Sequence, residues 1–319
     1  MKNFSIFFES FFCILFLINT IHSQENNILK KLGFERDSKL LIIHNDDIGM
    51  SQSVNSASFD AFDKGYINSG SVMVPCPWFL EVVQYSKKNP NLDIGIHLTL
   101  TSEWKNYKWG GVSSSDKIKS ILDDKGHFYP EVSYVQKNAK YNEVKNELEA
   151  QINYSLSNGL RPTHLDTHMG AVRATPKTLQ AYLEVGNKFQ LPVQISEDYK
   201  SILDNKLIDF TRIDKSKLLF VKKIYGKQDD TPINYEEWMI FYKKVLDDIK
   251  PGLNVLLVHV GYDNDELKAI TVDHPNWGSK WRELDFKILE SEDFRKRLRN
   301  RNIELVTWNQ IKNLIYQMI

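Results

Sequence analysis

The fold of this chain is decided by an apolar run that ends in two acids, Leu40-Leu41-Ile42-Ile43-His44-Asn45-Asp46-Asp47-Ile48-Gly49-Met50. Four consecutive aliphatic residues predict a strand buried on both faces, as in a parallel sheet covered by helices. The carboxylates then follow at the carboxyl end of the strand, where parallel α/β folds place their chemistry. The structural alternative is that Asp46 and Asp47 form a turn that caps a helix starting near Ser51. The sequence downstream decides between these interpretations.

The first 23 residues have the pattern of a secretory signal peptide. Lys2 lies near the start, residues 11–18 form a short apolar core, and residues 21–23 resemble a cleavage site. That core is much shorter than the roughly 20 residues that a membrane-spanning helix needs. We therefore expect a secreted or periplasmic protein with no stable membrane span after signal removal. An uncleaved anchor is the alternative, but no apolar stretch follows to lengthen the core.

Size and composition limit what the mature chain can be. Residues 24–319 are long enough for a single catalytic barrel domain. Cys76 is the only cysteine among them, so an intramolecular disulfide is excluded. The 41 basic and 41 acidic residues of the full chain balance, and without a basic block nothing indicates a nucleic-acid partner. The oligomeric state is not fixed, and a homodimer stays open.

Apolar runs and helix-like segments alternate along almost the whole chain. Repeated βα units predict an α/β fold, a distorted or incomplete (β/α) barrel with parallel strands and helices outside. Residues 101–140 are rich in Gly, Ser, Trp and Tyr with weak periodicity, which predicts a loop insertion at a strand end. Besides the opening run, we expect strands at residues 69–74, 93–100, 162–168, 192–197, 218–225, 254–261 and 303–308, and one helix over 283–300.

Polar side chains of catalytic type lie on four of these strands. They are Asp46 with Asp47, then His97, then the trio His164, Asp166 and His168, and finally His259. Right-handed crossovers bring the carboxyl ends of parallel strands to one rim, so we expect these groups to meet. The two-residue period of a strand places the trio on one face, where each unpaired buried polar group would cost about 1–3 kcal/mol.

The clustering favours a metal site. A single histidine is more often a satisfied core or surface residue, but the four in this set are half of the eight in the chain. One carboxylate with two imidazoles suits a divalent ion and leaves positions open for water and substrate.

Four motifs in the same order resemble the YdjC-like carbohydrate deacetylases, which include chitooligosaccharide deacetylases. They are residues 45–51, 95–98, 162–168 and 259–263, and residues 281–284 resemble the C-terminal segment of that family. The resemblance covers nearly all of the mature chain. It implies a metal-dependent hydrolase that removes N-acetyl groups from amino sugars or their oligosaccharides through a metal-activated water.

The resemblance also implies roles for the clustered residues. One divalent ion, Mg or Zn, would be held by Asp47, His97 and His168. Asp46 would be the general base. His259 would be the general acid or help to hold the tetrahedral intermediate, since an imidazole ordinarily titrates near neutral pH. Asp166 would orient a ligand or contact the substrate, and His164 would support the ligands from behind, with substrate contact as the other option.

The substrate side of the site is less defined. Trp104 and Trp109 are candidate surfaces for stacking a sugar ring, with ordinary loop packing as the alternative. The same activated water could hydrolyse another ester or amide. A non-catalytic sugar-binding protein on the same scaffold is a rival from another class, although binding alone would not need Asp46 and His259.

Overall fold

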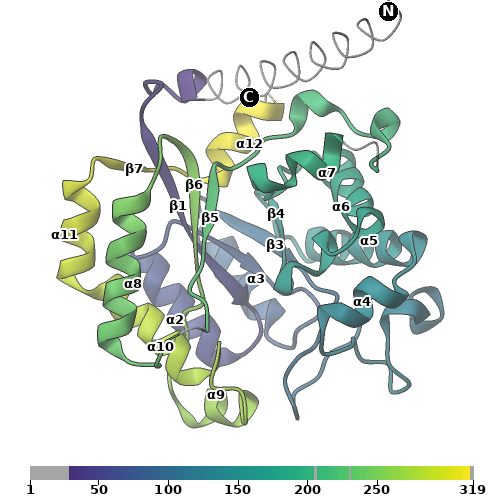
Figure 1. Ribbon diagram of the computed structural model, residues 1–319. Coiled ribbons are helices and arrows are strands. Elements are labelled where there is room, and N and C mark those ends of the chain that lie inside the picture. Colours follow the sequence, from purple (N-terminus) through teal and green to yellow (C-terminus); the bar gives the residue numbers. More distant parts are fainter. Residues whose placement is uncertain (1–28, 205–206, 230, 317–319) are drawn as a thin grey trace, which may run out of the picture.

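The computed structural model describes residues 29–204, 207–229 and 231–316. The predicted signal peptide, residues 1–23, lies outside these ranges. Parallel strands form the centre and helices surround them (Figure 1), so the predicted α/β fold is confirmed. Among the helices within the described ranges, none combines the length and the apolar character needed to cross a bilayer.

The sheet is organised around β1, which lies between β2 and β6 and pairs with β7 through its first residues. All of these pairings are parallel, in the order β4-β3-β2-β1-β6-β5. Every residue of β1 after Lys39 is buried, as its aliphatic run predicts. The strands are β1 Lys39–Ile48, β2 Ser69–Val72, β3 Ile94–Leu98, β4 Leu165–Thr167, β5 Lys223–Tyr225, β6 Gly252–Val258 and β7 Ile303–Leu305.

The sheet curls into a distorted barrel, and residues 192–197 bridge its two edges. This segment, predicted as a strand, meets β4 through one parallel bridge between Leu165 and Val193. A second single bridge joins Ser196 to Val221, just before β5. Pro192 accepts a hydrogen bond from the Leu165 amide but has no N–H to extend the ladder. The predicted strand is therefore reduced to isolated bridges.

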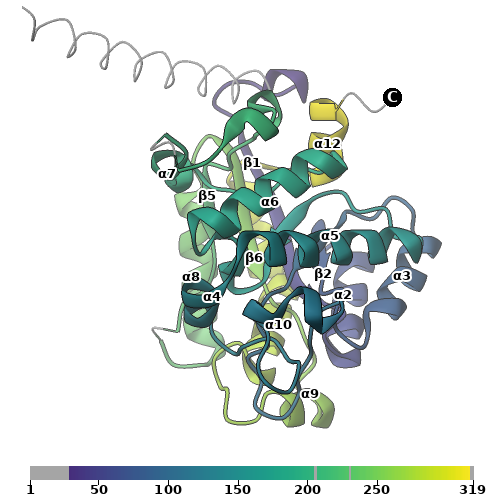
Figure 2. The same cartoon turned by 90° about the vertical axis from the view of Figure 1, so that its right-hand side faces the viewer.

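The helices cover the outside of the curled sheet (Figures 1 and 2). Among them, α5 packs against α6, and α8 packs against α10 and α11. The single helix predicted over 283–300 is wrong, because Ser291 ends α10 and caps α11 by accepting a hydrogen bond from the Phe294 amide. The α-helices are α2 Gln52–Asp63, α3 Phe79–Lys88, α4 Val132–Asn138, α5 Tyr141–Ser157, α6 Pro176–Phe189, α7 Lys200–Asp204, α8 Tyr235–Asp248, α9 Asp265–Ile270, α10 Ser279–Glu290, α11 Glu292–Asn300 and α12 Trp308–Tyr316.

Residues 101–140 follow β3 and contain two short 3-10 turns and α4 rather than long elements. The buried carboxylate of Glu147 on α5 anchors this segment. It accepts hydrogen bonds from the backbone amides of Val112, at 2.8 Å, and Ser113, at 2.9 Å. Because the backbone is fixed in this way, an irregular segment can still hold its side chains in defined places beside the strand ends.

Candidate metal centre

The end of β1 turns sharply and brings both of its acids into the interior. Asp47 has a left-handed backbone conformation with φ of 63°, and Gly49 follows with φ of 90°. In a regular strand the two neighbouring carboxylates would face opposite sides of the sheet, whereas here both are buried at one end of the barrel. Ser51 caps α2, since its hydroxyl accepts a hydrogen bond from the Val54 amide. The interpretation of the acids as a helix cap is therefore wrong.

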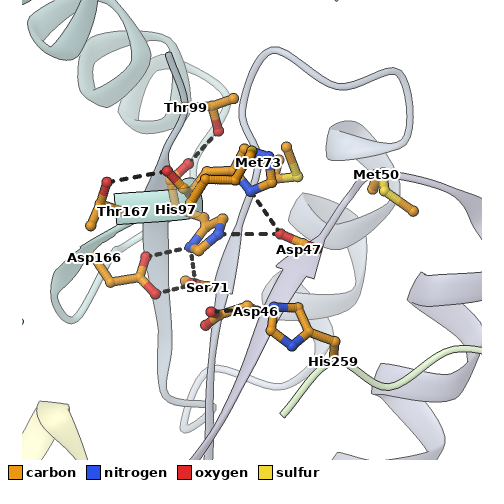
Figure 3. A network of polar contacts seen from close by, with 12 residues as sticks. Asp46, Asp47, Met50, Ser71, Met73, His97, Thr99, Asp166, Thr167 and His259 are labelled. Atoms are coloured by element: carbon orange, nitrogen blue, oxygen red, sulfur yellow. Dashed lines mark hydrogen bonds and ion pairs between the residues drawn. The ribbon is translucent and has the colours of Figure 1, made fainter. Parts of the chain in front are cut away.

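The three predicted metal ligands meet at this turn. Asp47 Oδ1 lies 3.2 Å from His97 Nε2 and 3.1 Å from His168 Nδ1. The side chains are buried and come from β1, β3 and the residue after β4, and Figure 3 shows Asp47 facing His97. One ligand atom from each residue lies close enough to the others to bind the same ion. A carboxylate with two imidazoles fits a divalent cation and does not select among zinc, magnesium and similar metals.

Each imidazole of this trio is fixed by a second carboxylate. His97 Nδ1 lies 2.8 Å from Asp166 Oδ1, and His168 Nε2 lies 2.9 Å from Glu103 Oε2. Since one nitrogen of each ring faces an outer carboxylate, the other nitrogen is directed at Asp47. Carboxylates in such places orient metal-binding imidazoles and raise their basicity. Sequence analysis missed Glu103 because it lies in an irregular segment where no strand period indicates its direction.

Asp47 is also paired with a buried cation from α10. Arg282 Nη2 lies 2.6 Å from Asp47 Oδ2, and Arg282 Nε donates to the Trp277 carbonyl at 2.7 Å. Burial alone would raise the pKa of Asp47, but the Arg282 guanidinium and the His168 ring hold that pKa well below its usual range. Asp47 is therefore ionised, as a metal ligand must be. Sequence analysis assigned Arg282 no role, although it lies in the last of the quoted motifs.

The predicted general base and acid also meet. Asp46 Oδ2 lies 3.7 Å from His259 Nε2, and the His259 side chain keeps 20% of its surface exposed. Burial raises the pKa of Asp46 to about 7, which suits a general base. Burial lowers the pKa of His259 to about 3. The expectation that His259 titrates near neutral pH is therefore wrong, because its ring is neutral at pH 7 and Asp46 holds a proton more readily.

The backbone beside His259 is held by two buried polar side chains. The His259 amide donates to Asp285 Oδ2 at 2.9 Å, and the Val260 amide donates to Asn45 Oδ1 at 2.8 Å. The other oxygen of Asp285 accepts hydrogen bonds from two aromatic side chains of α8. The segment that follows β6 is thus fixed to α10 on one side and to β1 on the other.

His164 lies behind the site and is fully buried. Its ring stacks on Trp308 at 5.3 Å, and Nδ1 lies 2.9 Å from Thr163 Oγ1. A Cβ at Gly95 would come within 2.5 Å of the ring, so the glycine makes room for it. Burial lowers the pKa of His164 well below its usual range, and the ring is neutral. Of the two roles given for His164, this buried position leaves support from behind rather than contact with the substrate.

The two tryptophans predicted to stack on a sugar are packed inside the protein. Trp104 is 2% exposed and donates from Nε1 to Met50 Sδ at 3.1 Å. Trp109 is 3% exposed and donates from Nε1 to the Thr101 carbonyl at 2.8 Å. Neither ring has a face free for a pyranose, so the stacking prediction is wrong for both and the alternative of loop packing holds.

The comparison with protein families agrees with this arrangement. A family model described as YdjC-like protein matches residues 40–300. The chain belongs to the YdjC-like family. The matched range contains each strand end that contributes to the trio, and also Glu103 and Arg282.

Named relatives of this YdjC-like chain cover most of its length. A protein named carbohydrate deacetylase from Thermoanaerobacter pseudethanolicus is 27% identical over 274 residues, which are 86% of this chain and 100% of the relative. Another of that name from Thermus thermophilus is 27% identical over 299 residues, 91% of this chain and 100% of the relative. A crystal structure from Enterococcus faecalis V583, titled as a candidate cellobiose-phosphate cleavage protein, matches with a TM-score of 0.71 at 23% identity. It covers 86% of this chain and 99% of the other, and this likeness shows the shared fold.

Replacing Glu103 by Gln should weaken metal binding. The change removes the negative charge beside His168 Nε2 but keeps the side chain's size, and loss of such outer partners typically costs about 10–100-fold in metal affinity. Calorimetric titration of the metal-free protein with Zn²⁺ measures the effect. Glu131→Gln, at an exposed position in the same segment, is the matched control. Equal affinities for wild type and Glu103→Gln would contradict the assigned contact.

Replacing Asp46 by Asn should stabilise the metal-free protein, and more so at higher pH. The pKa of Asp46 is raised from 3.8 to about 7 in the folded state, so its contribution to stability is present below about pH 4 and is lost as the pH rises through 7. The advantage of the variant should grow by about 2 kcal/mol between pH 5 and pH 8. Urea unfolding at both pH values, with Asp293→Asn as an exposed control, would refute this if the gain were the same at each.

Proposed function

We propose that this chain is a metal-dependent hydrolase that removes N-acetyl groups from amino sugars or their oligosaccharides. The observation that carries the proposal is the meeting of the ligand trio, Asp47, His97 and His168, with Asp46 and His259 at one end of the barrel. Hydrolysis of an amide needs an activated water, a charge to stabilise the oxyanion and a proton for the departing amine. The relatives named carbohydrate deacetylase support the class of substrate.

The residues divide this chemistry among them. The trio would hold a divalent ion, which when bound lowers the pKa of a water molecule and polarises a carbonyl oxygen. Asp46 would accept a proton from the water as the oxygen of that water bonds to the acyl carbon. Asp46, which holds a proton more readily than His259, would then give that proton to the nitrogen, and His259, neutral at rest and 3.7 Å from Asp46, would help to hold the tetrahedral intermediate. The carbon–nitrogen bond then breaks, and acetate and a free amine leave.

Two other functions use the same scaffold. Hydrolysis of a different ester or amide would need the same five side chains, and the burial of Trp104 and Trp109 removes one argument for a sugar. A sugar-binding protein without activity would have no use for a buried acid whose pKa is raised to about 7 beside an imidazole that keeps 20% of its surface exposed. The pairing of Asp46 with His259 therefore favours an enzyme.

We also propose that the enzyme acts outside the cytoplasm. The support for this is the pattern of residues 1–23, with an early lysine and a short apolar core before a cleavage-like end. A substrate met in that compartment would be an acetylated oligosaccharide of the cell surface or the surroundings.

Acetate release from N-acetylglucosamine oligomers tests the proposal. Metal-free protein, protein reloaded with Zn²⁺ or Mg²⁺, and reloaded Asp46→Asn would be assayed together. We expect release by reloaded wild type and none by the metal-free protein, with reloaded Asp46→Asn about 10²–10⁴-fold slower because it lacks the general base. The exposed variant Asp293→Asn should match wild type.

The outcome separates the alternatives. Release from an acetyl ester but from no acetylated sugar, by protein that binds the metal, would contradict the sugar and favour another acyl substrate. No hydrolysis of any acyl compound by metal-bound protein would favour the sugar-binding alternative.

A further inference from the structure

A second polar cluster lies directly behind the candidate metal centre, and none of the roles discussed so far includes its histidine. His44 projects from the middle of β1 and is completely buried. Its Nε2 lies 3.0 Å from Asp166 Oδ2 and 3.3 Å from Asp46 Oδ1. We propose that His44 is a positioning residue that orients Asp46 and Asp166 together. The proposal rests on the proposed function, because that function makes Asp46 the general base and Asp166 the partner of a metal-binding histidine.

His44 completes the fixation of Asp166. Asp166 Oδ1 lies 2.8 Å from His97 Nδ1, within hydrogen-bond distance. Asp166 Oδ2 lies 3.0 Å from His44 Nε2 and accepts a hydrogen bond from the Ser71 hydroxyl at 2.8 Å. Figure 3 shows the Asp166 carboxylate in contact with both Ser71 and His97. With both oxygens held, the carboxylate cannot rotate. The direction of the His97 ring is thereby set from His44 through Asp166.

His44 also holds the predicted general base. Asp46 Oδ2 faces His259, and Asp46 Oδ1 is a buried oxygen that has no hydrogen bond among the described residues. The nearest cationic or donor group recorded for that oxygen is His44 Nε2, at 3.3 Å. The imidazole thus lies between two buried carboxylates that would otherwise repel each other at short range. Without it, Asp46 would lose the contact that keeps Oδ2 turned toward His259.

The ring of His44 is itself fixed by its neighbours, so that it can orient the two carboxylates. Its Nδ1 lies 2.9 Å from Ser69 Oγ and its Nε2 lies 3.1 Å from Ser71 Oγ, both on the neighbouring β2. His164 packs against it edge to face, with ring centroids 4.9 Å apart. His44 and Ser69 are direct partners in the β1–β2 register. A side chain placed on the central strand in this way has little freedom to move.

Two substitutions separate positioning from mere filling of space. In His44→Gln the amide nitrogen can occupy the place of Nε2, where it can donate to Asp166 and stay beside Asp46 Oδ1. In His44→Asn the shorter amide reaches only the place of Nδ1, beside Ser69. Both replacements are polar and smaller than histidine, so both disturb the packing. His127→Asn, at a side chain about one-third exposed and outside the site, is the matched control.

Zn²⁺ affinity of the metal-free proteins and the kcat and KM of the reloaded enzymes provide the readouts. We expect His44→Asn to weaken Zn²⁺ binding about 10-fold through Asp166 and His97. We expect it to lower kcat about 10–100-fold with KM changed less than about 3-fold, since the loss concerns proton transfer. His44→Gln should recover both quantities to within about 3-fold of wild type. Ser69→Ala, which frees Nδ1, replaces His44→Asn if that variant does not fold, and should weaken Zn²⁺ binding detectably.

The results decide the proposal independently of the substrate. Equal losses in the Gln and Asn variants, or no loss in either, would overturn it. Two Zn²⁺ ions per wild-type chain, with one lost in both variants, would also overturn it by assigning His44, Asp46 and Asp166 to a second ion. If wild type hydrolyses no acetylated sugar, the proposed function fails, but the order of Zn²⁺ affinities still confirms or refutes the positioning role.

Discussion

The structure depends on how two adjacent carboxylates are kept at the buried end of β1. Burying a charge costs several kcal/mol unless it is paired, and here each acid is met by its own set of partners. Asp47 receives the Arg282 guanidinium and two imidazoles, and Asp46 lies between His44 and His259. Because the partners other than His44 come from α10 and from strand ends on both sides of β1, both acids are fully compensated only once the barrel is assembled. The pairing of Asp47 with the Arg282 guanidinium keeps the Asp47 carboxylate charged. Asp46 has weaker partners, and its pKa is raised to about 7.

This difference in charge compensation gives the neighbouring residues Asp46 and Asp47 different roles. An ionised carboxylate is a ligand, and a carboxylate whose pKa lies near 7 is a base. One helix supports both functions, because Arg282 and Asp285 lie three residues apart on the same face of α10. The first bonds Asp47 and the second holds the backbone of His259. A shift of α10 would therefore disturb the metal ligand Asp47 and the His259 segment together.

The parallel sheet and the clustering of polar groups could be predicted because strands have a simple period and their carboxyl ends converge, whereas the choice of Asp47, His97 and His168 as ligands came from the family resemblance. The partners Glu103, Arg282 and Asp285 could not be predicted, since they come from a loop and a helix whose approach depends on tertiary packing. Composition suggested sugar-stacking tryptophans, but it cannot tell an exposed ring from one that fills the base of a loop. The low pKa of His259 also could not be predicted, because it is caused by burial in the folded protein, which residue type alone does not show.

The most direct test of this account is the position of a bound ion in a crystal of the protein grown with Zn²⁺, located by its anomalous scattering. The account predicts one ion, bound to Asp47, His97 and His168 at the roughly 2.0–2.2 Å typical of zinc with nitrogen and oxygen ligands. Asp166 and Glu103 should then still hold the outer nitrogens of the two rings. An ion at His44, Asp46 and Asp166 with the trio empty would contradict the account, as would a site that stays empty at saturating Zn²⁺.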